Sequence, residues 1–411
     1  MKHGRILCVT SNFPRWADDS TTPFILHLAQ DLQKLDWEVD VLAPHAKGTA
    51  KSEILGGVHV ERFRYLWPSS LETVCYQGGA LINLRKNRVN YFKLPALIAC
   101  ESLNLFLRFI QRKYDLLHSH WILPQGFTGV LTAGPLRIPH VTTVHGGDIF
   151  GLKGTLLTIF KRLALRHADA VTVNSSVTEK AVKKILPVLK ELHRIPMGVS
   201  IHKSATSSFS RKLRNQYRRG KGPLLIFVGR LVEEKGVDDL IRAVSILKPK
   251  FPDMTALIIG EGQDRQELES ISIMLGLSDQ VFFPGWVKPD LVPAYLAAGD
   301  IFIAPSKKAK DGWIEAQGLT VIEAMMAKTP VITTRIGGIV DSVKHGETGL
   351  LVEEKSPNEI AKAIDQLARE PFLANYLSDQ GYKLALSRFS RATSAETFSA
   401  LFDRMIQLKG A

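Results

Sequence analysis

Residues 224–236 read LLIFVGRLVEEKG, a run of consecutive apolar residues followed by Gly229, Arg230 and Lys235. A short apolar run without polar alternation is typical of a strand that is buried on both faces, as in a parallel sheet. Glycine and charged residues directly after it indicate a turn at the carboxyl end of that strand. The stretch therefore predicts the first strand and turn of an α/β domain.

Similar runs recur on both sides of this stretch, and each is followed by a segment long enough for a helix. In the second half they span residues 255–262, 280–286, 301–306 and 330–335; in the first half they span 5–11, 38–44, 115–121, 140–146 and 170–175. Strands that alternate with helices form parallel sheets covered by helices on both faces. Two such sets predict two doubly wound, Rossmann-like domains.

The boundary between the two domains is expected near residues 197–222, which are rich in Ser and Arg and poor in apolar residues. We therefore predict a first domain at residues 1–197 and a second at 198–393. The 411 residues of the chain are enough for two full cores.

Composition narrows the class of protein further. Hydrophobic residues make up 45% and charged residues 23%, as in an ordinary globular protein. The net charge of +13 is uneven, because residues 1–197 carry 25 Lys and Arg against 15 Asp and Glu. The first domain should attract anions, which leaves nucleic acid, an anionic lipid surface and a phosphorylated substrate as possible partners.

Localisation is expected to be cytosolic. Three scattered cysteines, Cys8, Cys75 and Cys100, are too few for a disulfide framework or a cysteine zinc site. The N-terminal apolar run has four residues, too short for a signal peptide, and no run in the sequence comes near the ~20 apolar residues that span a bilayer.

The segment 311–327 places two carboxylates, Glu315 and Glu323, eight positions apart. Thr320 and Glu323 have capping-box spacing, which predicts a helix from Val321 with its first amides facing an anion. Glu323 could instead only close that box, and Glu315 could be a solvated loop acid. A hydrolytic pair is disfavoured, because retaining hydrolases hold their carboxyls ~5–5.5 Å apart, whereas eight helical residues rise ~12 Å.

The turn after residues 224–228 carries a second candidate. Gly229 permits a tight turn, Arg230 can bond phosphate oxygens with its planar fork, and Lys235 adds a point charge. Together they are typical of a diphosphate clamp, although a strand end with these residues can also be ordinary surface.

In the first domain, histidines and an aspartate follow two expected strands: His118 and His120 in one segment, His145 and Asp148 in the other. Such histidines can simply be packed core residues. His145, which is followed by two glycines, is the best candidate for a histidine with a functional role instead. Neither segment has the His and Cys spacing of a zinc site, so we expect no catalytic metal.

These segments together resemble the retaining GT-B-fold glycosyltransferases of family four, also called glycosyl transferases group one. The similarity is carried in order by VGRLVEEKG (228–236), IIGEG (258–262), FFPGW (282–286), Glu315 and Glu323 followed by AMMAKTPVI (324–332), and GGIVDSVKHGETGLLV (337–352). The resemblance implies a GT-B fold with two domains facing across a cleft. It also implies that the first domain binds the acceptor, that the second binds a nucleotide-sugar donor, and that a helix at about 394–408 packs back on the first domain.

The resemblance also implies roles for individual residues. Glu315 would bond the donor sugar, Glu323 the ribose, and His145 the donor sugar from the other domain. Arg230 and Lys235 would neutralise the diphosphate. Further donor contacts are implied at Gly229, Gly260, Glu261, Trp286, Val287, Gln317, Gly318, Leu319 and Thr320; candidates on the acceptor side are His120, Asp148 and Arg15.

The loop at residues 12–23 departs from the family pattern. Many relatives have a Gly-Gly pair there, close to the donor phosphates, and this chain has none. Guanine-using relatives can place an acid shortly after the turn that receives the base; here Lys288 and Pro289 follow this turn, with Asp290 next. This favours UDP over GDP or ADP.

The segment 85–93 holds four cations, Arg85, Lys86, Arg88 and Lys93, next to aromatic residues. It could lie against anionic headgroups. For the following helix, expected at 95–112, we favour core packing of a face formed by Leu97, Ile98, Leu105 and Phe109.

The sequence thus predicts a metal-independent, retaining hexosyltransferase that uses a front-face mechanism, with the nucleotide-sugar as substrate and no cofactor. Its expected acceptor is a glycan or lipid-linked glycan, and it could lie peripherally on the inner face of the plasma membrane. Alternatives are a nucleotide-sugar epimerase and a noncatalytic nucleotide-sugar or polyanion-binding protein. Nucleic acid is not an expected partner, because no base-stacking motif accompanies the basic residues.

Overall fold

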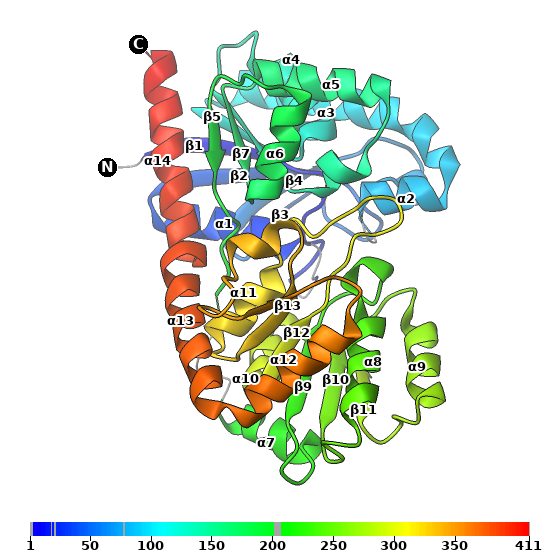
Figure 1. Cartoon of the computed structure of the whole chain (residues 1–411). Coiled ribbons are helices and arrows are strands. Elements are labelled where there is room, and N and C mark those ends of the chain that lie inside the picture. Colours follow the sequence, from blue (N-terminus) through cyan, green and yellow to red (C-terminus); the bar gives the residue numbers. More distant parts are fainter. Residues whose placement is uncertain (1–2, 18, 20–21, 77–78, 201–206, 411) are drawn as a thin grey trace. The chain divides into compact units, whose positions relative to one another are not determined.

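The computed structural model describes residues 3–17, 19, 22–76, 79–200 and 207–410. The chain forms two compact units (Figure 1). Unit 1 comprises Met1–Gly198 and Arg391–Ala411, and unit 2 comprises Val199–Ser390. Each unit is built around its own sheet.

Unit 1 contains an eight-stranded sheet in the order β3-β4-β2-β1-β5-β6-β7-β8. The strands are β1 (Gly4–Val9), β2 (Trp37–Pro44), β3 (Ser52–Leu55), β4 (Val58–Phe63), β5 (Leu116–His120), β6 (His140–Val144), β7 (Ala170–Val173) and β8 (Leu192–Arg194). All neighbours pair in parallel except β3, which pairs antiparallel with β4. The five strands predicted for this half are confirmed as β1, β2, β5, β6 and β7.

The helices of unit 1 follow the strands and cover both faces of the sheet. They are α1 (Pro23–Lys34), α2 (Ala80–Lys86), α3 (Leu94–Gln111), α4 (Phe127–Ala133), α5 (Thr155–His167), α6 (Ser176–Ile185) and α14 (Arg391–Gly410). Short helical turns are η1 (Ser69–Leu71), η2 (Arg88–Lys93), η3 (Ile122–Gly126) and η4 (Gly147–Gly151).

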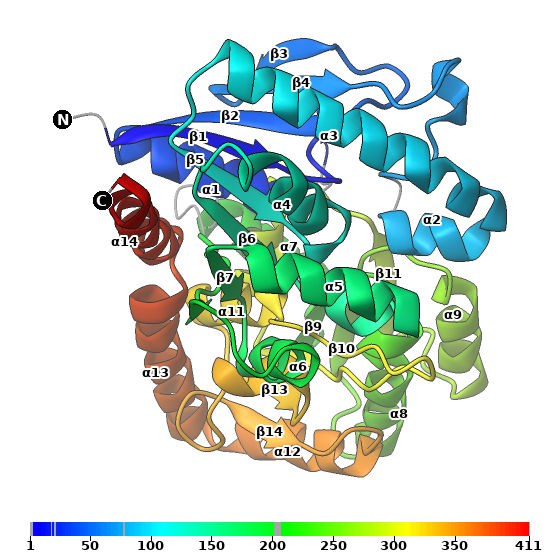
Figure 2. The same cartoon turned by 90° about the horizontal axis from the view of Figure 1, so that it is seen from above.

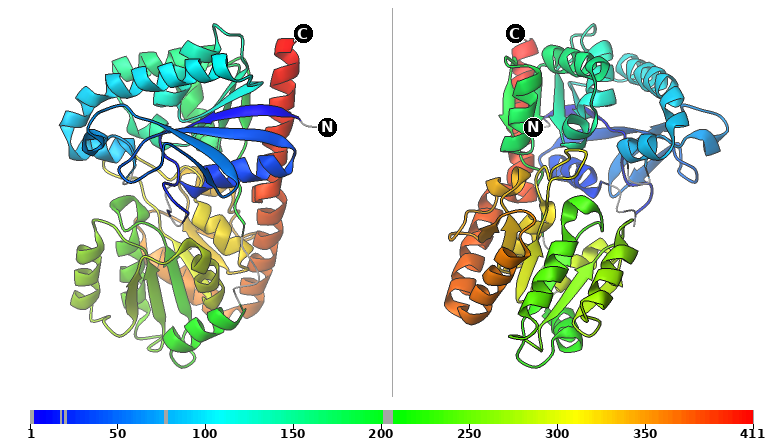
Figure 3. Two further views of the ribbon diagram at one scale, coloured as in Figure 1. Left: turned by 180° about the vertical axis from the view of Figure 1, so that it is seen from behind. Right: turned by 45° about the vertical axis from the view of Figure 1, so that its right-hand side comes forward.

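The C-terminal helix α14 belongs to unit 1, where it lies beside α1 (Figure 3). The Arg391 guanidinium bonds the Asp31 carboxylate of α1, with Nε 2.5 Å from Oδ2. The indole nitrogen of Trp37 donates to the Ser399 hydroxyl at 2.8 Å. These buried contacts tie a segment from the end of the chain to the first strands and helix.

Unit 2 contains a six-stranded, fully parallel sheet in the order β11-β10-β9-β12-β13-β14 (Figure 1). The strands are β9 (Leu224–Val228), β10 (Thr255–Ile259), β11 (Val281–Gly285), β12 (Ile301–Ala304), β13 (Val331–Thr334) and β14 (Leu350–Val352). This is the strand order of a Rossmann domain. The prediction of two doubly wound domains is therefore confirmed.

Helices cover both faces of the unit 2 sheet. They are α7 (Ser207–Tyr217), α8 (Val237–Leu247), α9 (Arg265–Met274), α10 (Val292–Ala298), α11 (Leu319–Met326), α12 (Pro357–Arg369) and α13 (Pro371–Phe389); short turns are η6 (Glu233–Lys235), η7 (Pro289–Leu291) and η8 (Gly337–Asp341). Successive residues of β9 face opposite cores: Leu225 packs in one buried cluster and Leu224 in the other. Burial on both faces explains why the strand has no polar alternation.

Two expectations about the elements were wrong. The stretch expected as a linker contains α7, whose Phe209, Leu213 and Tyr217 recur every four residues and pack in a core of unit 2. The expectation that no segment could span a bilayer also fails by length and composition, because Arg88–Gln111 forms one helical stretch whose most apolar 18-residue window has a mean hydropathy of 1.2.

Candidate active site

The strand order of unit 2 reverses between β9 and β12, which are neighbours although far apart in sequence. In open α/β sheets, ligands bind at such a switch point, beyond the carboxyl ends of the strands. Arg230 and Lys235 follow β9, and Glu315 follows β12. The fold therefore brings three of the predicted site residues to the switch point.

Lys235 and Glu315 form a partly buried ion pair there, in which the ammonium group donates to Oε2. Burial alone would raise the pKa of the Glu315 carboxyl. The adjacent Lys235, a hydrogen bond from the Gly318 amide and the charge of Arg230 instead hold this pKa below its ordinary value. Glu315 is thus an anion at neutral pH, surrounded by groups that attract negative charge.

Arg230 lies beside this pair and its side chain is 52% exposed. Its Nη2 atom is 3.5 Å from Oε1 of Glu234, four residues along the chain. Most of the guanidinium fork therefore faces solvent. It remains able to bond a diphosphate.

Helix α11 starts earlier than predicted. Gly318 is its N-cap in the left-handed conformation (φ 75°), and the helix begins at Leu319 without a side-chain cap. The predicted capping box between Thr320 and Glu323 is wrong, because Gly318 closes the turn by its backbone conformation instead. The first amides of α11, including those of Leu319 and Thr320, lie directly after Glu315, where an anion would be attracted.

Glu323 lies in the first turns of α11 and is partly buried. Burial raises the pKa of its carboxyl to about 7. Glu323 therefore titrates close to neutral pH in the ligand-free protein. Gln317, in the turn before the helix, is buried.

The loop after β13 packs closely on Glu315, a contact that the sequence did not predict. The Gly338 amide donates to the Glu315 carbonyl at 2.9 Å. At Gly337 (φ 60°), a Cβ atom would lie 2.0 Å from that same carbonyl oxygen, so no other residue fits. The Gly-Gly pair itself was a signal for this contact. Glu234 was also missed as the partner of Arg230.

The loops after β9, β10 and β11 are joined by backbone bonds. The Gly229 amide donates to the Ile259 carbonyl at 3.0 Å, and the Gly260 amide to the Gly285 carbonyl at 2.9 Å. Glu261 pairs with Arg265. Trp286 follows directly with 51% exposure, and Val287 is partly buried. The structure thus places Gly229, Gly260, Glu261 and Trp286 on adjoining loops, as expected for one wall of a site.

In unit 1, the three histidines form one cluster at the carboxyl ends of β5 and β6. His120 Nδ1 and His145 Nε2 are 2.9 Å apart, so one ring donates and the other accepts. His118 contacts His120 with ring centroids 4.2 Å apart. Burial lowers the pKa of His145 to about 3, and burial with the neighbouring histidine charges does the same for His118. The cluster is neutral at physiological pH.

Asp148 ties together the two loops that carry these histidines. Its buried carboxylate accepts from the Ile122 amide at 2.8 Å and from the Gly146 amide at 3.0 Å. Burial raises the pKa of this carboxyl, whereas the hydrogen bonds from the two amides and the positive charge of Lys161 lower it. The contacts give Asp148 a positioning role for the loop after His145; acceptor contact by Asp148 or His120 stays a prediction.

The remaining predicted residues lie elsewhere on unit 1. Arg15 bonds Asp19 with Nε 2.6 Å from Oδ2, and its guanidinium carbon lies 4.3 Å above the Trp16 ring. Part of its loop, including Asp18, lies outside the described residues. Arg85 and Lys86 end α2, while Arg88 and Lys93 lie in η2; Lys93 donates to the Thr73 hydroxyl at 2.8 Å.

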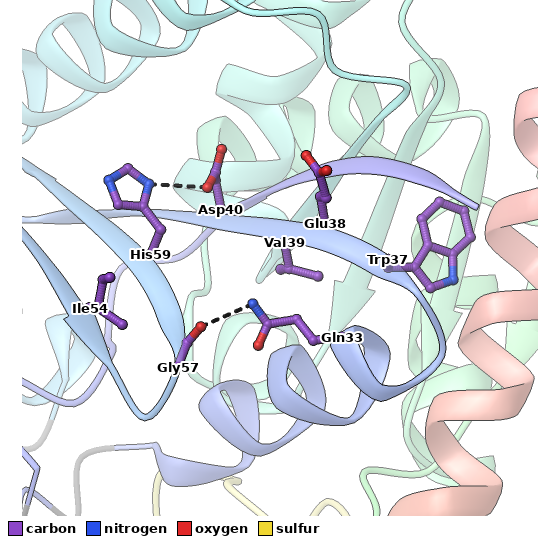
Figure 4. Close-up of a pocket in the computed structure, with 8 residues that line it drawn as sticks. All are labelled: Gln33, Trp37, Glu38, Val39, Asp40, Ile54, Gly57 and His59. Carbon is purple, nitrogen blue, oxygen red and sulfur yellow. Dashed lines mark hydrogen bonds and ion pairs between the residues drawn. The ribbon is translucent and has the colours of Figure 1, made fainter. Parts of the chain in front are cut away.

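A separate hollow of about 390 Å³ in unit 1 is lined by the first residues of β2, together with α1 and the β3-β4 hairpin (Figure 4). Asp40 in this hollow bonds His59, with Oδ1 3.0 Å from Nδ1. The hollow lies at the amino end of β2, whereas the histidine cluster lies at the carboxyl ends of the parallel strands. It is therefore not part of the candidate site.

No group of three or more His, Cys, Asp or Glu side chains suited to a metal ion occurs in the described part of the chain. The groups at the switch point that can donate to an anion are the Arg230 guanidinium, the Lys235 ammonium and the helix-end amides. This donor set suits a phosphate anion.

Sequence comparison matches two family descriptions to successive parts of the chain: Glycosyltransferase Family 4 to residues 22–203, and Glycosyl transferases group 1 to residues 209–384. The chain is 30% identical over 268 residues to an uncharacterised glycosyltransferase of Methanocaldococcus jannaschii, covering 65% of this chain and 69% of the relative. The chain belongs to this glycosyltransferase family, and its second half is the group 1 domain.

A further relative is the GDP-mannose-dependent alpha-(1-6)-phosphatidylinositol monomannoside mannosyltransferase of Mycolicibacterium smegmatis, with 29% identity over 66% of this chain and 71% of the relative. Two similar structures are sucrose-phosphate synthase of Thermosynechococcus elongatus (TM-score 0.77, 20% identity) and Anabaena HepE in complex with UDP (TM-score 0.75, 21% identity); each alignment covers 98% of this chain and 100% of the other. These likenesses confirm the GT-B fold class, and the protein is a glycosyltransferase.

Proposed function

We propose that this glycosyltransferase moves a hexosyl-type sugar from a UDP-linked donor to a glycan or lipid-linked acceptor, with retention of configuration. The observation that carries the proposal is the Lys235–Glu315 pair at the switch point of unit 2, directly before the first amides of α11. A cation, an anion and free amide donors meet there, as a charged phosphate ester and a hydroxyl-rich sugar require.

The diphosphate is assigned to Arg230, Lys235 and the first amides of α11, those of Leu319 and Thr320. Arg230 offers a largely exposed fork, and Lys235 offers an ammonium group that Glu315 already orients. Glu315, an anion at neutral pH, accepts from sugar hydroxyls, and Glu323 accepts from ribose hydroxyls. His145 is the proposed contact for the donor sugar from unit 1.

In the proposed reaction, the bond between the sugar C1 and the phosphate oxygen breaks as the acceptor oxygen bonds C1 on the same face. The acceptor proton passes to the departing phosphate oxygen, so atoms and charge balance without a covalent enzyme intermediate. Fixed donors that face the developing phosphate charge stabilise it as the bond breaks. Arg230, Lys235 and the α11 amides are the proposed donors that stabilise this negative charge, so the proposed reaction needs no metal ion.

The base is assigned to the loop at Trp286 and Val287, with UDP preferred because Lys288 and Pro289 follow it. Anabaena HepE, bound to UDP, supports this choice of base, whereas the mycobacterial relative is named for GDP-mannose. That relative's phosphatidylinositol monomannoside supports a lipid-linked acceptor. Such an acceptor suits a cytoplasmic protein on the inner face of the plasma membrane.

The test is a transfer assay with radiolabelled UDP- and GDP-sugars, a lipid extract as acceptor, and separate detection of free nucleotide and labelled lipid. We expect transfer from a UDP-sugar that survives EDTA and falls about 100-fold or more in Glu315→Gln. Glu347→Gln, at an exposed acid of the same unit, is the matched control. Loss of transfer in EDTA or full activity of Glu315→Gln would contradict the mechanism, and GDP-sugar use would correct the base.

A further inference from the structure

The outward side of α3 is apolar from Pro95 to Ile110. All exposed residues between Leu94 and Ile110 are apolar: Pro95, Ala99, Leu103, Phe106, Leu107 and Ile110. We call these six residues the outer face of α3. Leu103 and Ile110 are 57% and 63% exposed, respectively. A surface helix normally turns charged and polar side chains to solvent, so this face is built for a nonaqueous neighbour.

The preceding turn η2 extends the apolar surface. Phe92 is 86% exposed, Val89 57% and Tyr91 50%. Together η2 and α3 form the stretch Arg88–Gln111, of which 17% of the most apolar window is buried. In Figure 2, α3 runs along unit 1 as a long helix with α2 at its start and α4 beside it.

The opposite side of α3 holds the helix on unit 1. Leu97 and Leu105 are buried in its core, and Phe109 packs partly buried against the same cluster, as the sequence predicted for this face. Glu101 is fully buried and accepts from the Thr128 hydroxyl at 2.5 Å and the Gln125 amide at 2.9 Å. The helix is therefore fixed to the domain and can meet a bilayer only at its surface, along the outer face.

The charges around the outer face indicate which kind of surface it contacts. Residues 73–114 contain seven Lys and Arg, and their one acid is the buried Glu101. The exposed cations stand at both ends of the helix: Arg85, Lys86 and Arg88 before it, and after it Lys113 and Arg112, whose Nη1 lies 3.3 Å from Asp40 Oδ2. A second copy packed on this face in a twofold dimer would bring cations against cations in either helix direction. Anionic headgroups complement both ends.

We propose that the outer face of α3, together with η2, binds the interfacial region of an anionic phospholipid bilayer. The apolar side chains enter the boundary between headgroups and acyl chains, as amphipathic surface helices do. The terminal cations contact the headgroups. This extends the purely electrostatic contact expected from Arg85, Lys86, Arg88 and Lys93, because the helix face itself is the binding element, and it does not depend on the identity of the donor.

The experiment is flotation of the full chain with vesicles of phosphatidylglycerol and phosphatidylcholine, or of phosphatidylcholine alone. We expect binding to the anionic vesicles that weakens in high salt, and a loss of tenfold or more in the double variant Phe106→Glu/Leu107→Glu. The control is Phe372→Glu in unit 2, where Phe372 is 91% exposed; it should bind as the wild type does. Urea unfolding checks that both variants are folded.

A second variant, Arg85→Glu/Lys86→Glu, keeps the helix face and should lower binding to anionic vesicles while reducing its salt dependence. Donor hydrolysis without acceptor should stay unchanged in every variant, since none of these residues lies in the donor site. Unchanged vesicle binding of Phe106→Glu/Leu107→Glu would overturn the proposal. So would a wild-type dimer in sedimentation velocity that this variant dissociates, with no vesicle binding by the wild type.

Discussion

The ammonium group of Lys235 is bonded to the carboxylate of Glu315 across 80 residues of sequence. Each residue follows a central strand of the unit 2 sheet, Lys235 after β9 and Glu315 after β12, so their meeting is a consequence of the strand order. The pair places a cation and an anion at the point where a Rossmann domain receives its ligand. In the proposed function, the pair organises the donor site before any donor arrives.

Replacing Lys235 tests the role of this pair in phosphate binding. Lys235→Ala removes a cation from the proposed diphosphate site and leaves the Glu315 anion to repel phosphate, so the Kd for UDP should rise about 100-fold or more. Isothermal titration calorimetry measures this change. Lys250→Ala is the matched control, because Lys250 pairs with Asp365 on the surface of the same unit. Equal UDP affinity of the two variants would show that Lys235 does not contribute to diphosphate binding.

Glu323 should make donor binding depend on pH. Its pKa of about 7 in the free protein means that it is half protonated near neutrality. Only the carboxylate accepts from both ribose hydroxyls, so UDP affinity should increase as pH rises through 7 in the wild type relative to Glu323→Gln. UDP is titrated into both proteins at pH 6, 7 and 8. Because the ionisation of UDP affects both affinities alike, it cancels in the comparison of the two proteins. Parallel pH profiles would show that Glu323 does not contact the nucleotide.

Glu101 in α3 should affect stability with a known sign. Burial raises its pKa to about 7 in the folded protein, above the ~4.3 of an unfolded glutamate. Its contribution to stability is complete below pH ~4.3 and is lost as pH rises through 7. Relative to Glu101→Gln, the wild type should lose on the order of 3 kcal/mol of unfolding free energy between pH 4.5 and 8. Urea unfolding of both proteins measures the difference; a constant difference would contradict the prediction.

Asp148 should position the loop after His145. Asp148→Ala leaves the Ile122 and Gly146 amides buried without their acceptor, which costs about 1–3 kcal/mol for each amide. Asp148→Asn keeps one carbonyl acceptor and should cost less. Urea unfolding ranks the stabilities of the wild type, Asp148→Asn and Asp148→Ala. If the position of this loop governs catalysis, kcat should fall in the same order. Wild-type stability of Asp148→Ala would show that these bonds are dispensable.

Much of the fold follows from local sequence. Runs such as LLIFVGR are buried on both faces, and continuous apolar composition signals such strands directly. The β3-β4 hairpin was missed because neither strand is a continuous apolar run: SEIL is mostly exposed or half-buried, and VHVERF alternates buried and half-buried positions. Helix α7 was missed for another reason: Ser and Arg dominate its composition, and the three apolar residues at four-residue spacing carry the only signal.

Site residues were predictable where the strand rule applies and not where tertiary packing decides. The positions of Arg230, Lys235 and Glu315 follow from their places after strands. The start of α11 depended on Gly318 adopting a left-handed conformation, which a capping box does not encode. In α3, the pattern predicted the core face with Leu97, Leu105 and Phe109, but apolar residues occur on every side, so the pattern alone did not show that the opposite face remains exposed.

The most direct measurement is a crystal structure of the protein with UDP or a UDP-sugar. The account predicts the diphosphate within hydrogen-bond distance of the Arg230 guanidinium, the Lys235 ammonium and the first amides of α11, with Glu323 at the ribose. A nucleotide bound away from the carboxyl ends of β9 and β12, with Lys235 and Glu315 still paired and untouched by it, would contradict the central claim.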